Sequence, residues 1–404
     1  MAFSVPRAYV DMVDLAQARG VAPTKYTNGL GTTRMSVAAA DEDPVTLAAN
    51  AARRLFALSG RSPSEIGLCA VGTETAVDHS KPIAAYLHGM LGLPPQCRVF
   101  ETKHACFGGT AGLLNAVDWI ASGSARGRSA LVICTDIARY SLGSPGEPTQ
   151  GGGAVAMIIS ESPRLLELEV GVSGSYARDV HDFWRPLNRK DALVDGHFSV
   201  QCYLDALAGA YQDWKANGGD PTTLARTCYH VPYGKMARKA HRHRKMIDGL
   251  REDEADATFA GEVEQSLQFP AQIGNVYTGS LYLALASLLS KDARELTGKR
   301  VGLFSYGSGC VAEFFAGRVG KEAAALVDKL ELDSVLTNRE RLSIEAYEAM
   351  RRADEEGDRA YVPESSGTID VQGTHAVFLG VDDQHRRVYG NEPAPEPLAV
   401  VTAA

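Results

Sequence analysis

Apolar and polar residues follow two distinct patterns along the chain. Short, almost uninterrupted apolar runs are typical of strands buried on both faces, and longer segments between them carry apolar residues at helical spacing. Over the first 160 residues the two kinds of segment take turns, which predicts an α/β layer architecture. The strands are expected at 66–71, 97–101, 129–135 and 154–160, and the helices at 9–19, 41–59, 80–91 and 111–120.

The second half of the chain has a related layout, which begins after an interruption. Residues 175–220 are rich in aromatic side chains and are expected to form an inserted helical region. No residue-level repeat links the halves, so their relation rests on the order of elements alone. We predict two related α/β halves, residues 1–165 and 166–404. The later elements are expected at 227–231 (strand), 277–289 (helix), 301–305 (strand), 330–358 (charged helical arm) and 376–388 (strand or hairpin).

The composition is that of an ordinary soluble globular protein. The chain has 404 residues, of which 45% are apolar and 22% charged, so it can bury a large core. A net charge of −8 argues against a nucleic-acid binder and suits a cytoplasmic protein. The local exception is the basic cluster Arg238–Lys245, which is expected either to meet an anionic cofactor or to form a solvated helix face.

The seven cysteines are scattered and form no CxxC pair. This spacing indicates neither a disulfide framework nor a zinc site, and a reducing compartment fits it best. No apolar run reaches about 18 residues, so no transmembrane helix is expected. The N-terminus lacks the basic segment and apolar core of a signal peptide.

One of these cysteines, Cys106, lies where an extended run leads into an alanine-rich helix. The unpaired N–H groups and positive dipole end of a helix favour a thiolate at such a junction. Gly108 and Gly109 follow, and they allow a substrate to approach the backbone closely. Cys106 is therefore a candidate nucleophile, although a small buried packing residue is the commoner role of a cysteine.

Two more candidates follow predicted strands, Glu74 and His230. Ligands bind at such strand ends in α/β sheets, and a cysteine, a histidine and a carboxylate make a coherent set for acyl transfer. A helix cap or solvated loop residue is the alternative for Glu74, and a packing residue is the alternative for His230.

Two polar turns provide supporting groups. Asn275 opens an apolar helix and is expected either to hydrogen-bond a substrate carbonyl or to cap the helix. The turn at Ser308 offers a backbone N–H that can form an oxyanion hole with the N–H of Cys106, unless it is simply a tight turn.

At these residues nearly the whole chain resembles the 3-hydroxy-3-methylglutaryl-CoA synthases of the bacterial mevalonate pathway, condensing enzymes of the thiolase superfamily. Each matching motif is weak alone, but together and in this order they are specific. The motifs are Val71-Gly72-Thr73-Glu74, Lys103-His104-Ala105-Cys106-Phe107-Gly108-Gly109, Asp136-Ile137-Ala138-Arg139-Tyr140, Ser144-Pro145-Gly146-Glu147-Pro148-Thr149-Gln150-Gly151, Asp182-Phe183-Trp184-Arg185-Pro186, Tyr229-His230-Val231-Pro232-Tyr233, Gly274-Asn275-Val276-Tyr277-Thr278 and Phe304-Ser305-Tyr306-Gly307-Ser308-Gly309.

The resemblance implies a fold and a reaction. The fold would be thiolase-like, with layers in the order α-β-α-β-α, in a homodimer that needs no metal or redox cofactor. Cys106 would accept acetyl from acetyl-CoA, Glu74 would remove a methyl proton from it, and His230 with Asn275 would hold acetoacetyl-CoA. Ser308, Tyr140, Asp136 and Asp182 would support the site and bind substrate, with Lys235 and Lys239 as candidates for the phosphates of CoA.

Three alternatives and two departures accompany this resemblance. A relative that acts on acyl carrier protein in polyketide β-branching shares Glu74, Cys106 and His230, so these residues do not separate the two. A thiolase or ketoacyl synthase would lack the match at Glu74, and an inactive binding scaffold would have lost one of the three.

Only two residues precede the first matching segment, so either the start lies upstream or the edge of the first sheet is shortened. His104 stands where the family has a residue such as Asn or Gln, and is expected to affect the thiolate pKa or to pack.

Overall fold

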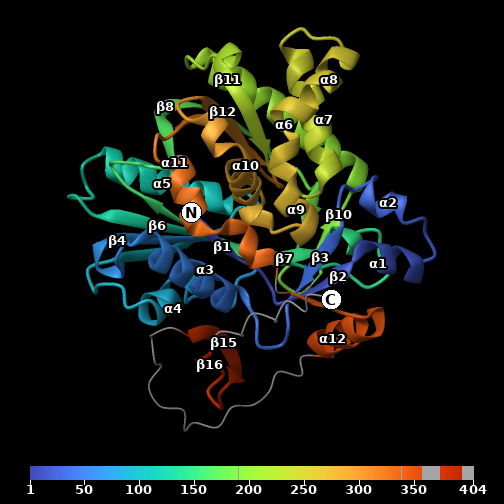
Figure 1. The fold of residues 1–404 in the computed structure, drawn as a ribbon. Coiled ribbons are helices and arrows are strands. Elements are labelled where there is room, and N and C mark those ends of the chain that lie inside the picture. The colour runs from blue at the N-terminus through green and yellow to red at the C-terminus, as the bar shows by residue number, and fades with distance from the viewer. Residues whose placement is uncertain (190, 338, 357–373, 394–404) are drawn as a thin grey trace, which may run out of the picture.

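Two separate sheets carry the long strands, and each is built from one half of the sequence (Figure 1). The computed structural model describes residues 1–189, 191–337, 339–356 and 374–393. The first sheet has the order β1-β7-β6-β4-β5 and the second the order β11-β12-β13-β8. Their bounds are β1 Ala2–Ser4, β4 Ile66–Gly72, β5 Arg98–Thr102, β6 Ser129–Ala138, β7 Gly151–Ile159, β8 Leu166–Ala177, β11 Leu224–Tyr229, β12 Arg300–Gly307 and β13 Val311–Val319.

The two sheets share one pattern of strand directions. In the first, β4 is parallel to β6, β7 is antiparallel to β6, and β1 forms the edge antiparallel to β7. In the second, β11 is parallel to β12, β13 is antiparallel to β12, and β8 forms the edge antiparallel to β13. The halves are therefore related in topology, as the order of elements predicts.

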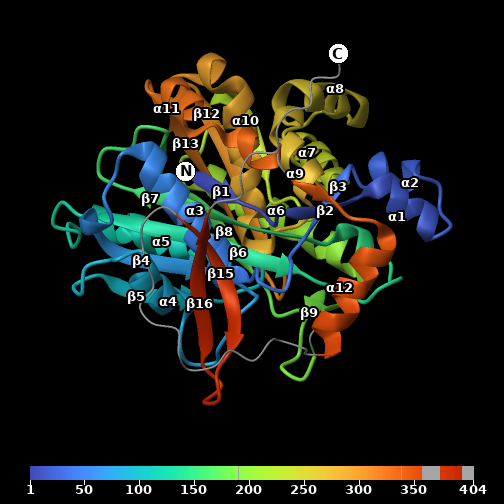
Figure 2. The same ribbon diagram turned by 60° about the horizontal axis from the view of Figure 1, so that its bottom comes forward.

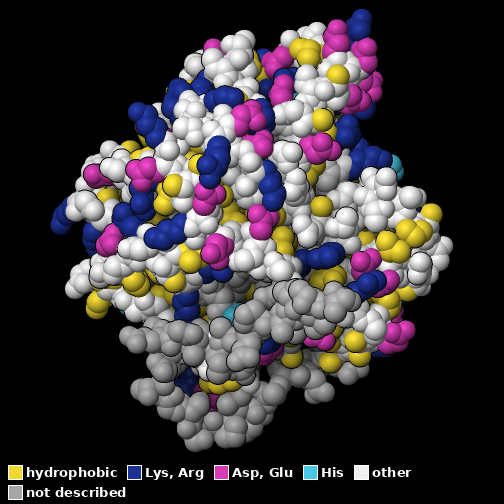
Figure 3. Space-filling view, in the orientation of Figure 1, with side chains coloured by type: hydrophobic (Ala, Val, Ile, Leu, Met, Phe, Trp, Pro, Cys, Tyr) yellow, Lys and Arg dark blue, Asp and Glu magenta, His cyan; other side chains and the backbone are white. Residues whose placement is uncertain are grey.

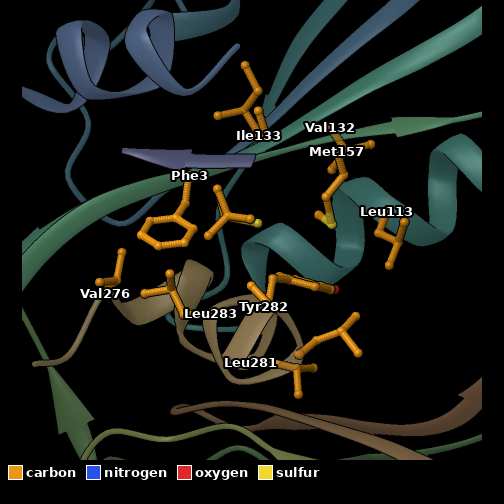
Figure 4. Packing of buried hydrophobic residues seen from close by; sticks show 14 of the residues in the cluster. Phe3, Leu113, Val132, Ile133, Met157, Val276, Leu281, Tyr282 and Leu283 are labelled. Atoms are coloured by element: carbon orange, nitrogen blue, oxygen red, sulfur yellow. The ribbon is translucent and has the colours of Figure 1, made fainter. Parts of the chain in front are cut away.

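Helices lie between the sheets and on both outer faces. Helices α5 and α10 occupy the central layer, α3 and α4 cover the first sheet, and α6 and α7 cover the second (Figures 1 and 2). In the central packing, Phe3 of β1 faces Leu283 of α10 (Figure 4). This is the expected α-β-α-β-α order of a thiolase-like fold. The bounds are α3 Pro44–Ser59, α4 Ile83–Met90, α5 Gly108–Ala121, α6 Gly196–Ala216, α7 Gly234–Ile247 and α10 Ser280–Leu296.

The segment expected as a helical insertion, about 175–220, contains the end of β8, a small hairpin and α6. The hairpin strands are β9, Phe183–Trp184, and β10, Leu193–Val194. Helix α6 packs against β8 and β13, so it serves as an outer layer of the second sheet. The described hairpin strands form a two-stranded sheet of their own, apart from the two main sheets.

The smaller elements surround this framework. A three-stranded sheet of order β14-β2-β3 lies beside α1 and α2, and the strands β15 and β16 form a separate hairpin. On the face drawn in Figure 3, basic and acidic side chains are interspersed. The bounds are β2 Ala8–Asp11, α1 Met12–Ala18, α2 Thr24–Thr27, β3 Arg34–Val37, α8 Glu252–Glu262, α9 Gln268–Ile273, α11 Ala323–Leu330, β14 Glu340–Arg341, α12 Ile344–Glu356, β15 Thr374–Val381 and β16 Arg387–Pro393.

Five expected helix starts, at residues 9, 41, 80, 111 and 277, are each three residues from the observed start, and capping residues explain the first two. The helix expected from residue 9 begins at Met12, because Asp11 ends β2 and its side chain accepts a hydrogen bond from the Val13 N–H at 2.9 Å. The helix expected from residue 41 begins at Pro44, where Asp43 and Thr46 form a capping box.

The charged arm expected at 330–358 is not one helix. Helix α11 ends at Leu330, and Glu331 takes a positive φ of 46° before a short 3₁₀ turn, β14 and α12. Leu332 and Leu336 in that turn are buried, so packing overrides the helical pattern. Residues 338, 357 and 358 lie outside the described residues.

The edge of the first sheet carries a strand. Residues 2–4 form β1, and Ala2 pairs with Ala156 of β7. The first matching segment therefore begins inside an edge strand that is three residues long.

Candidate active site

Glu74 and Cys106 meet at the ends of two neighbouring parallel strands. Glu74 lies two residues beyond β4, and Cys106 lies four residues beyond β5. Parallel strands end at the same edge of a sheet, so the two loops converge. The Cys106 Sγ–H donates a hydrogen bond to Glu74 Oε1 at 3.0 Å. A thiol and a carboxylate are thus placed for direct proton transfer.

The backbone around Cys106 is held in a tight geometry. Ala105 has a φ of 40°, in the left-handed region that side chains other than glycine rarely adopt. Behind the loop, a Cβ built on Gly72 would lie 2.2 Å from the Gly109 N, so β4 contacts the start of α5 without side chains between them. This close contact fixes Cys106 relative to Glu74.

The expectation that the helix mouth favours a thiolate at Cys106 is wrong for this arrangement. Burial raises the pKa of the Cys106 thiol well above its usual range, and the carboxylates of Glu74 and Asp136 raise it further. Desolvation and two acidic neighbours outweigh the helix dipole, which is worth a few tenths of a kcal/mol to about 2 kcal/mol. Cys106 is a thiol until a base takes its proton.

Glu74 is set up as that base. Burial raises the pKa of Glu74 to about 8, the charge of Asp136 acts in the same direction, and the Cys106 hydrogen bond acts against it. A carboxylate with such a pKa is far more basic than an exposed one, which suits removal of a proton at neutral pH.

Asp136, a predicted substrate-binding residue, instead lies behind the catalytic loop. It is fully buried on β6, and it accepts hydrogen bonds from the Glu74 N–H at 2.8 Å and the Thr278 N–H at 3.0 Å. The hydroxyls of Thr73, Thr75 and Thr278 also donate to it. Both carboxylate oxygens are occupied by protein donors, so Asp136 orients the Glu74 loop.

His230 and Asn275 come from the second half and face the same cavity. His230 follows β11, and burial lowers the pKa of its imidazole to about 3, so the ring is neutral near pH 7. Asn275 Oδ1 accepts from the Tyr277 N–H at 2.9 Å and from the Ser280 Oγ–H at 2.8 Å. These donors fix the amide orientation, so Asn275 caps its turn through Oδ1 and keeps Nδ2 as a donor.

These groups line a cavity of about 650 Å³, which is within the usual range for a small-molecule site. Cys106, His230 and Asn275 line it, together with Tyr140 and Ser308. Most of the remaining wall is aromatic or aliphatic, which excludes water from the reacting groups. Besides Tyr140, the aromatic lining residues are Phe183, Tyr203, Tyr233, Tyr277 and Tyr306.

Asp182, also predicted to bind substrate, has a supporting position. It is fully buried, accepts from the Tyr306 hydroxyl at 2.7 Å, and accepts from the Gly309 N–H at 3.0 Å. Ser308 lies between these two residues and lines the cavity. Asp182 therefore holds the turn that presents Ser308.

Lys235 and Lys239 are not among the residues that line the cavity. Lys235 is exposed at the start of α7, and Tyr233 and Met236 beside it reach the cavity wall. Further along α7, the basic side chains that were candidates for an anionic cofactor are engaged with acidic partners. Arg242 pairs with Glu252 and Asp256, Arg244 with Glu262 and Asp248, and Lys245 with Glu262.

Sequence reasoning missed several residues of this site. Tyr203 and Tyr306 line the cavity, and the Tyr203 hydroxyl donates to the His230 carbonyl at 2.8 Å. Arg189 on the hairpin loop also reaches the wall. The aromatic richness of 175–220 was the available signal, but residue spacing gave no direction for these side chains.

His104, the residue that departs from the family pattern, is exposed. Its ring meets the Phe107 ring edge-on with the ring centroids 6.3 Å apart, and partial desolvation against the protein surface lowers the pKa of its imidazole. This geometry favours the packing role over an effect on Cys106.

Within the described ranges, no three His, Cys, Asp or Glu side chains are placed to share a metal ion. No helix among those ranges combines the length and apolar character needed to cross a membrane.

Comparison with known proteins agrees with this geometry. The family description hydroxymethylglutaryl-coenzyme A synthase N terminal matches residues 1–163, and its C-terminal counterpart matches 166–258 and 242–392. The hydroxymethylglutaryl-CoA synthase of Enterococcus faecalis is 40% identical over 351 residues, covering 87% of this chain and 90% of the relative.

Two solved structures are similar over nearly the whole chain. MvaS in complex with 3-hydroxy-3-methylglutaryl coenzyme A has a TM-score of 0.90 and 48% identity, covering 96% of this chain and 97% of that one. The curacin biosynthetic pathway HMG synthase in complex with holo donor-ACP has a TM-score of 0.87 and 32% identity, covering 97% of this chain and 98% of that one. The chain belongs to the hydroxymethylglutaryl-coenzyme A synthase family.

Proposed function

We propose that this protein condenses acetyl-CoA with acetoacetyl-CoA and water to give 3-hydroxy-3-methylglutaryl-CoA and CoA, the step that supplies the mevalonate pathway. The observation that carries the proposal is the 3.0 Å hydrogen bond between Cys106 Sγ and Glu74 Oε1, at the wall of a cavity that also contains His230 and Asn275.

In the first step, Cys106 Sγ attacks the thioester carbon of acetyl-CoA. The thiol proton passes to Glu74 Oε1 and then to the departing sulfur of CoA, which leaves an acetyl thioester on Cys106. The backbone N–H groups of Cys106 and Ser308 stabilise the oxyanion that forms during attack.

In the second step, Glu74 removes a proton from the methyl group of the acetyl-enzyme. The raised basicity of Glu74 suits this step, and the thioester makes the α-proton more acidic than that of an ester. The resulting carbon nucleophile attacks the ketone carbon of acetoacetyl-CoA and forms the new carbon–carbon bond.

His230 and Asn275 stabilise the ketone oxygen as it becomes an alkoxide. Neutral His230 donates through a ring N–H, and Asn275 donates through Nδ2. The proton that Glu74 took from the methyl group ends on this alkoxide, so Glu74 is ionised again once the carbon–carbon bond has formed. Water then hydrolyses the thioester to Cys106, and the product keeps the CoA that arrived with acetoacetyl-CoA.

No cofactor enters this scheme, since both substrates are CoA thioesters. Two of the similar solved structures offer different carriers, because one was solved with 3-hydroxy-3-methylglutaryl coenzyme A and the other with an acyl carrier protein. The higher identity, 48% against 32%, favours CoA. Condensation on a carrier protein, as in polyketide β-branching, is the second candidate.

Five further properties belong to this proposal. We infer two domains, residues 1–165 and 166–404, because each half builds its own sheet. We infer a homodimer from the family, a cytoplasmic location from the scattered free cysteines, and contact of Lys235 and Lys239 with CoA phosphates outside the cavity. Tyr140 lines the wall beside Cys106 and is assigned to substrate contact.

The test separates the two half-reactions. Purified protein receives acetyl-CoA with either acetoacetyl-CoA or an acetoacetyl carrier protein, and thiol release and protein mass are followed. We expect turnover with acetoacetyl-CoA and an acetyl group on Cys106. Turnover with the carrier substrate alone would overturn the choice of CoA, and an unchanged rate in Cys106→Ala would overturn the mechanism.

The variant Glu74→Ala tests whether Glu74 is the base that removes the methyl proton. Glu74 raises the pKa of Cys106 through its charge and its hydrogen bond, so its removal lowers the thiol pKa and offsets the lost proton acceptor. We therefore expect acetylation to persist while condensation falls by roughly 10²–10⁴-fold. Loss of acetylation in this variant would contradict the assignment and point to a different role for Glu74.

A further inference from the structure

A buried cluster joins the N-terminal helix α1 and the C-terminal helix α12 to one wall of the cavity. At its centre, Glu147 is 1% exposed and accepts hydrogen bonds from three parts of the chain. Arg19, which directly follows α1, donates through Nε and Nη2, both at 2.8 Å, and Tyr347 of α12 donates its hydroxyl at 3.1 Å. The Gly143 N–H of the same loop as Glu147 donates at 3.0 Å.

The cluster continues from Glu147 to the catalytic residues through Gln150. Gln150 Nε2 donates to the Tyr347 hydroxyl at 2.9 Å, and Gln150 Oε1 accepts from the Tyr140 N–H at 2.9 Å. The Gln150 carbonyl accepts from the Asn275 N–H at 3.3 Å. One side chain of α12 is therefore two hydrogen bonds away from both Tyr140 and Asn275.

Tyr140 is held by α12 on its other side as well. The Arg351 guanidinium donates to the Tyr140 carbonyl at 3.2 Å, one turn of α12 beyond Tyr347. A Cβ built on Gly146 would lie 2.6 Å from the Tyr140 ring, so the loop and the ring are in close contact. The loop itself lines the cavity at Ser141, Ser144, Pro145, Gly146 and Thr149. A shift of the loop would therefore move both Tyr140 and the cavity wall.

We propose that Tyr347 and Glu147 are positioning residues for condensation, which hold the loop of residues 140–150 so that Tyr140 and Asn275 face the reacting groups. This proposal rests on the proposed function, and it assigns a role to the charged segment that includes α12. Figures 1 and 2 place α12 beside α1 and apart from the cavity-lining elements of the second sheet, so Tyr347 acts through other residues.

A chain of buried and partly buried hydrogen bonds suits this role. The bonds that Tyr347 makes to Glu147 and Gln150 are buried, where hydrogen bonds are stronger and geometry is better defined, and the other bonds of the chain are partly buried. Displacement of a reacting group by about 1 Å costs roughly 10²-fold in rate, so small movements of the cavity wall should slow condensation measurably. Because Tyr347 already holds the loop before substrate binds, the wall needs no reorganisation during the reaction.

The hairpin β15–β16 offers a matched control for Tyr347. Tyr389 is also a buried tyrosine, and its hydroxyl donates to the Asp43 carboxylate at 2.8 Å. Neither Tyr389 nor Asp43 lines the cavity. Removal of either tyrosine hydroxyl deletes one bond to a buried carboxylate, but only Tyr347 connects to the cavity wall.

The experiment compares Tyr347→Phe with Tyr389→Phe in the full chain. For each variant, kcat and KM for acetoacetyl-CoA, the rate of Cys106 acetylation and the thermal midpoint are measured. We expect Tyr347→Phe to lose about tenfold in kcat/KM for condensation, with acetylation within about twofold of wild type. Tyr389→Phe should keep kcat/KM within about twofold while losing a similar amount of thermal stability.

A kcat/KM for Tyr347→Phe within twofold of wild type would overturn the proposal, as would an equal loss in Tyr389→Phe. The second variant, Glu147→Gln, keeps the side-chain volume and should reproduce the loss. In a Tyr140→Phe background the effect of Tyr347→Phe should shrink, because the Tyr140 hydroxyl that the network positions is already absent. Full additivity would overturn the path through Tyr140. A wild-type protein that acetylates Cys106 but never condenses would count against the proposed function instead.

Discussion

Replacement of Asp136 by asparagine tests the electrostatics of the site directly. The two oxygens of Asp136 together accept five hydrogen bonds, three on Oδ1 and two on Oδ2. An asparagine has one acceptor oxygen, and its NH₂ group cannot accept. The hydroxyl donors can rotate, but the N–H groups of Glu74 and Thr278 cannot.

Either orientation of the new amide leaves one backbone N–H without an acceptor. With the amide oxygen at the Oδ1 position, the Thr278 N–H loses its partner, and in the flipped orientation the Glu74 N–H does. A buried donor left unpaired costs about 1–3 kcal/mol. We expect Asp136→Asn to lower the free energy of unfolding by that amount, measured by denaturant titration.

The same change shifts the pH dependence of condensation. The negative charge of Asp136 helps to raise the pKa of Glu74 to about 8, and condensation needs ionised Glu74, so activity rises with pH through that value. Without that charge the pKa of Glu74 falls, and the acid limb of the kcat/KM profile should move down by about one pH unit.

Asp43→Asn is the control for this prediction. Asp43 is also a buried carboxylate, which accepts from Tyr389 and Arg387, but it lies away from the cavity. It should lose stability and keep the acid limb at the wild-type pH. A limb that stays in place in Asp136→Asn, or that moves equally in Asp43→Asn, would refute the assignment of charge to Asp136.

Three further changes test other parts of the structure. Burial lowers the pKa of His230 to about 3. Below pH 6.5 the unfolded chain therefore binds a proton at this residue that the folded chain does not. The free energy of unfolding should fall by about 2–3 kcal/mol between pH 6.5 and 4.5. His230→Gln should flatten that slope in urea unfolding at the two pH values. Gly72→Ala places a methyl group 2.2 Å from the Gly109 N, so it should cost at least about 1–3 kcal/mol and reduce acetylation of Cys106, measured by unfolding and mass spectrometry. Ala105 has a φ of 40°, so Ala105→Val should destabilise by about 1–2 kcal/mol while Ala105→Gly should not, and equal effects of the two would contradict the backbone argument.

The sequence predicts which residues approach one another at the sheet edge. Glu74 and Cys106 follow strands that are parallel neighbours, so their meeting follows from the α/β pattern once β4 and β5 are recognised. His230 follows β11 of the second sheet, and its approach depends on how the halves pack, which periodicity does not encode. The motif order of the family supplied that information.

Contacts between segments far apart along the chain could not be predicted from the sequence. Asp136 and Thr278 are 142 residues apart, and Glu147 and Tyr347 are 200 residues apart. A buried aspartate with five donors and an exposed one look alike in a sequence, so Asp136 and Asp182 were both assigned to substrate. Local spacing likewise placed Lys235 near the site without showing that its side chain is exposed.

The protonation state of Cys106 shows why local rules and the assembled site can disagree. A cysteine at a helix N-terminus favours the thiolate, and that local rule is sound for an isolated helix. Here the same burial that makes Glu74 a strong base also disfavours a second negative charge 3.0 Å away. A site that must deprotonate a methyl group needs the basic carboxylate more than a preformed thiolate. The thiol can lose its proton to Glu74 as it attacks, so one buried base serves both steps, and the raised pKa of Cys106 is a consequence of the basicity that condensation requires.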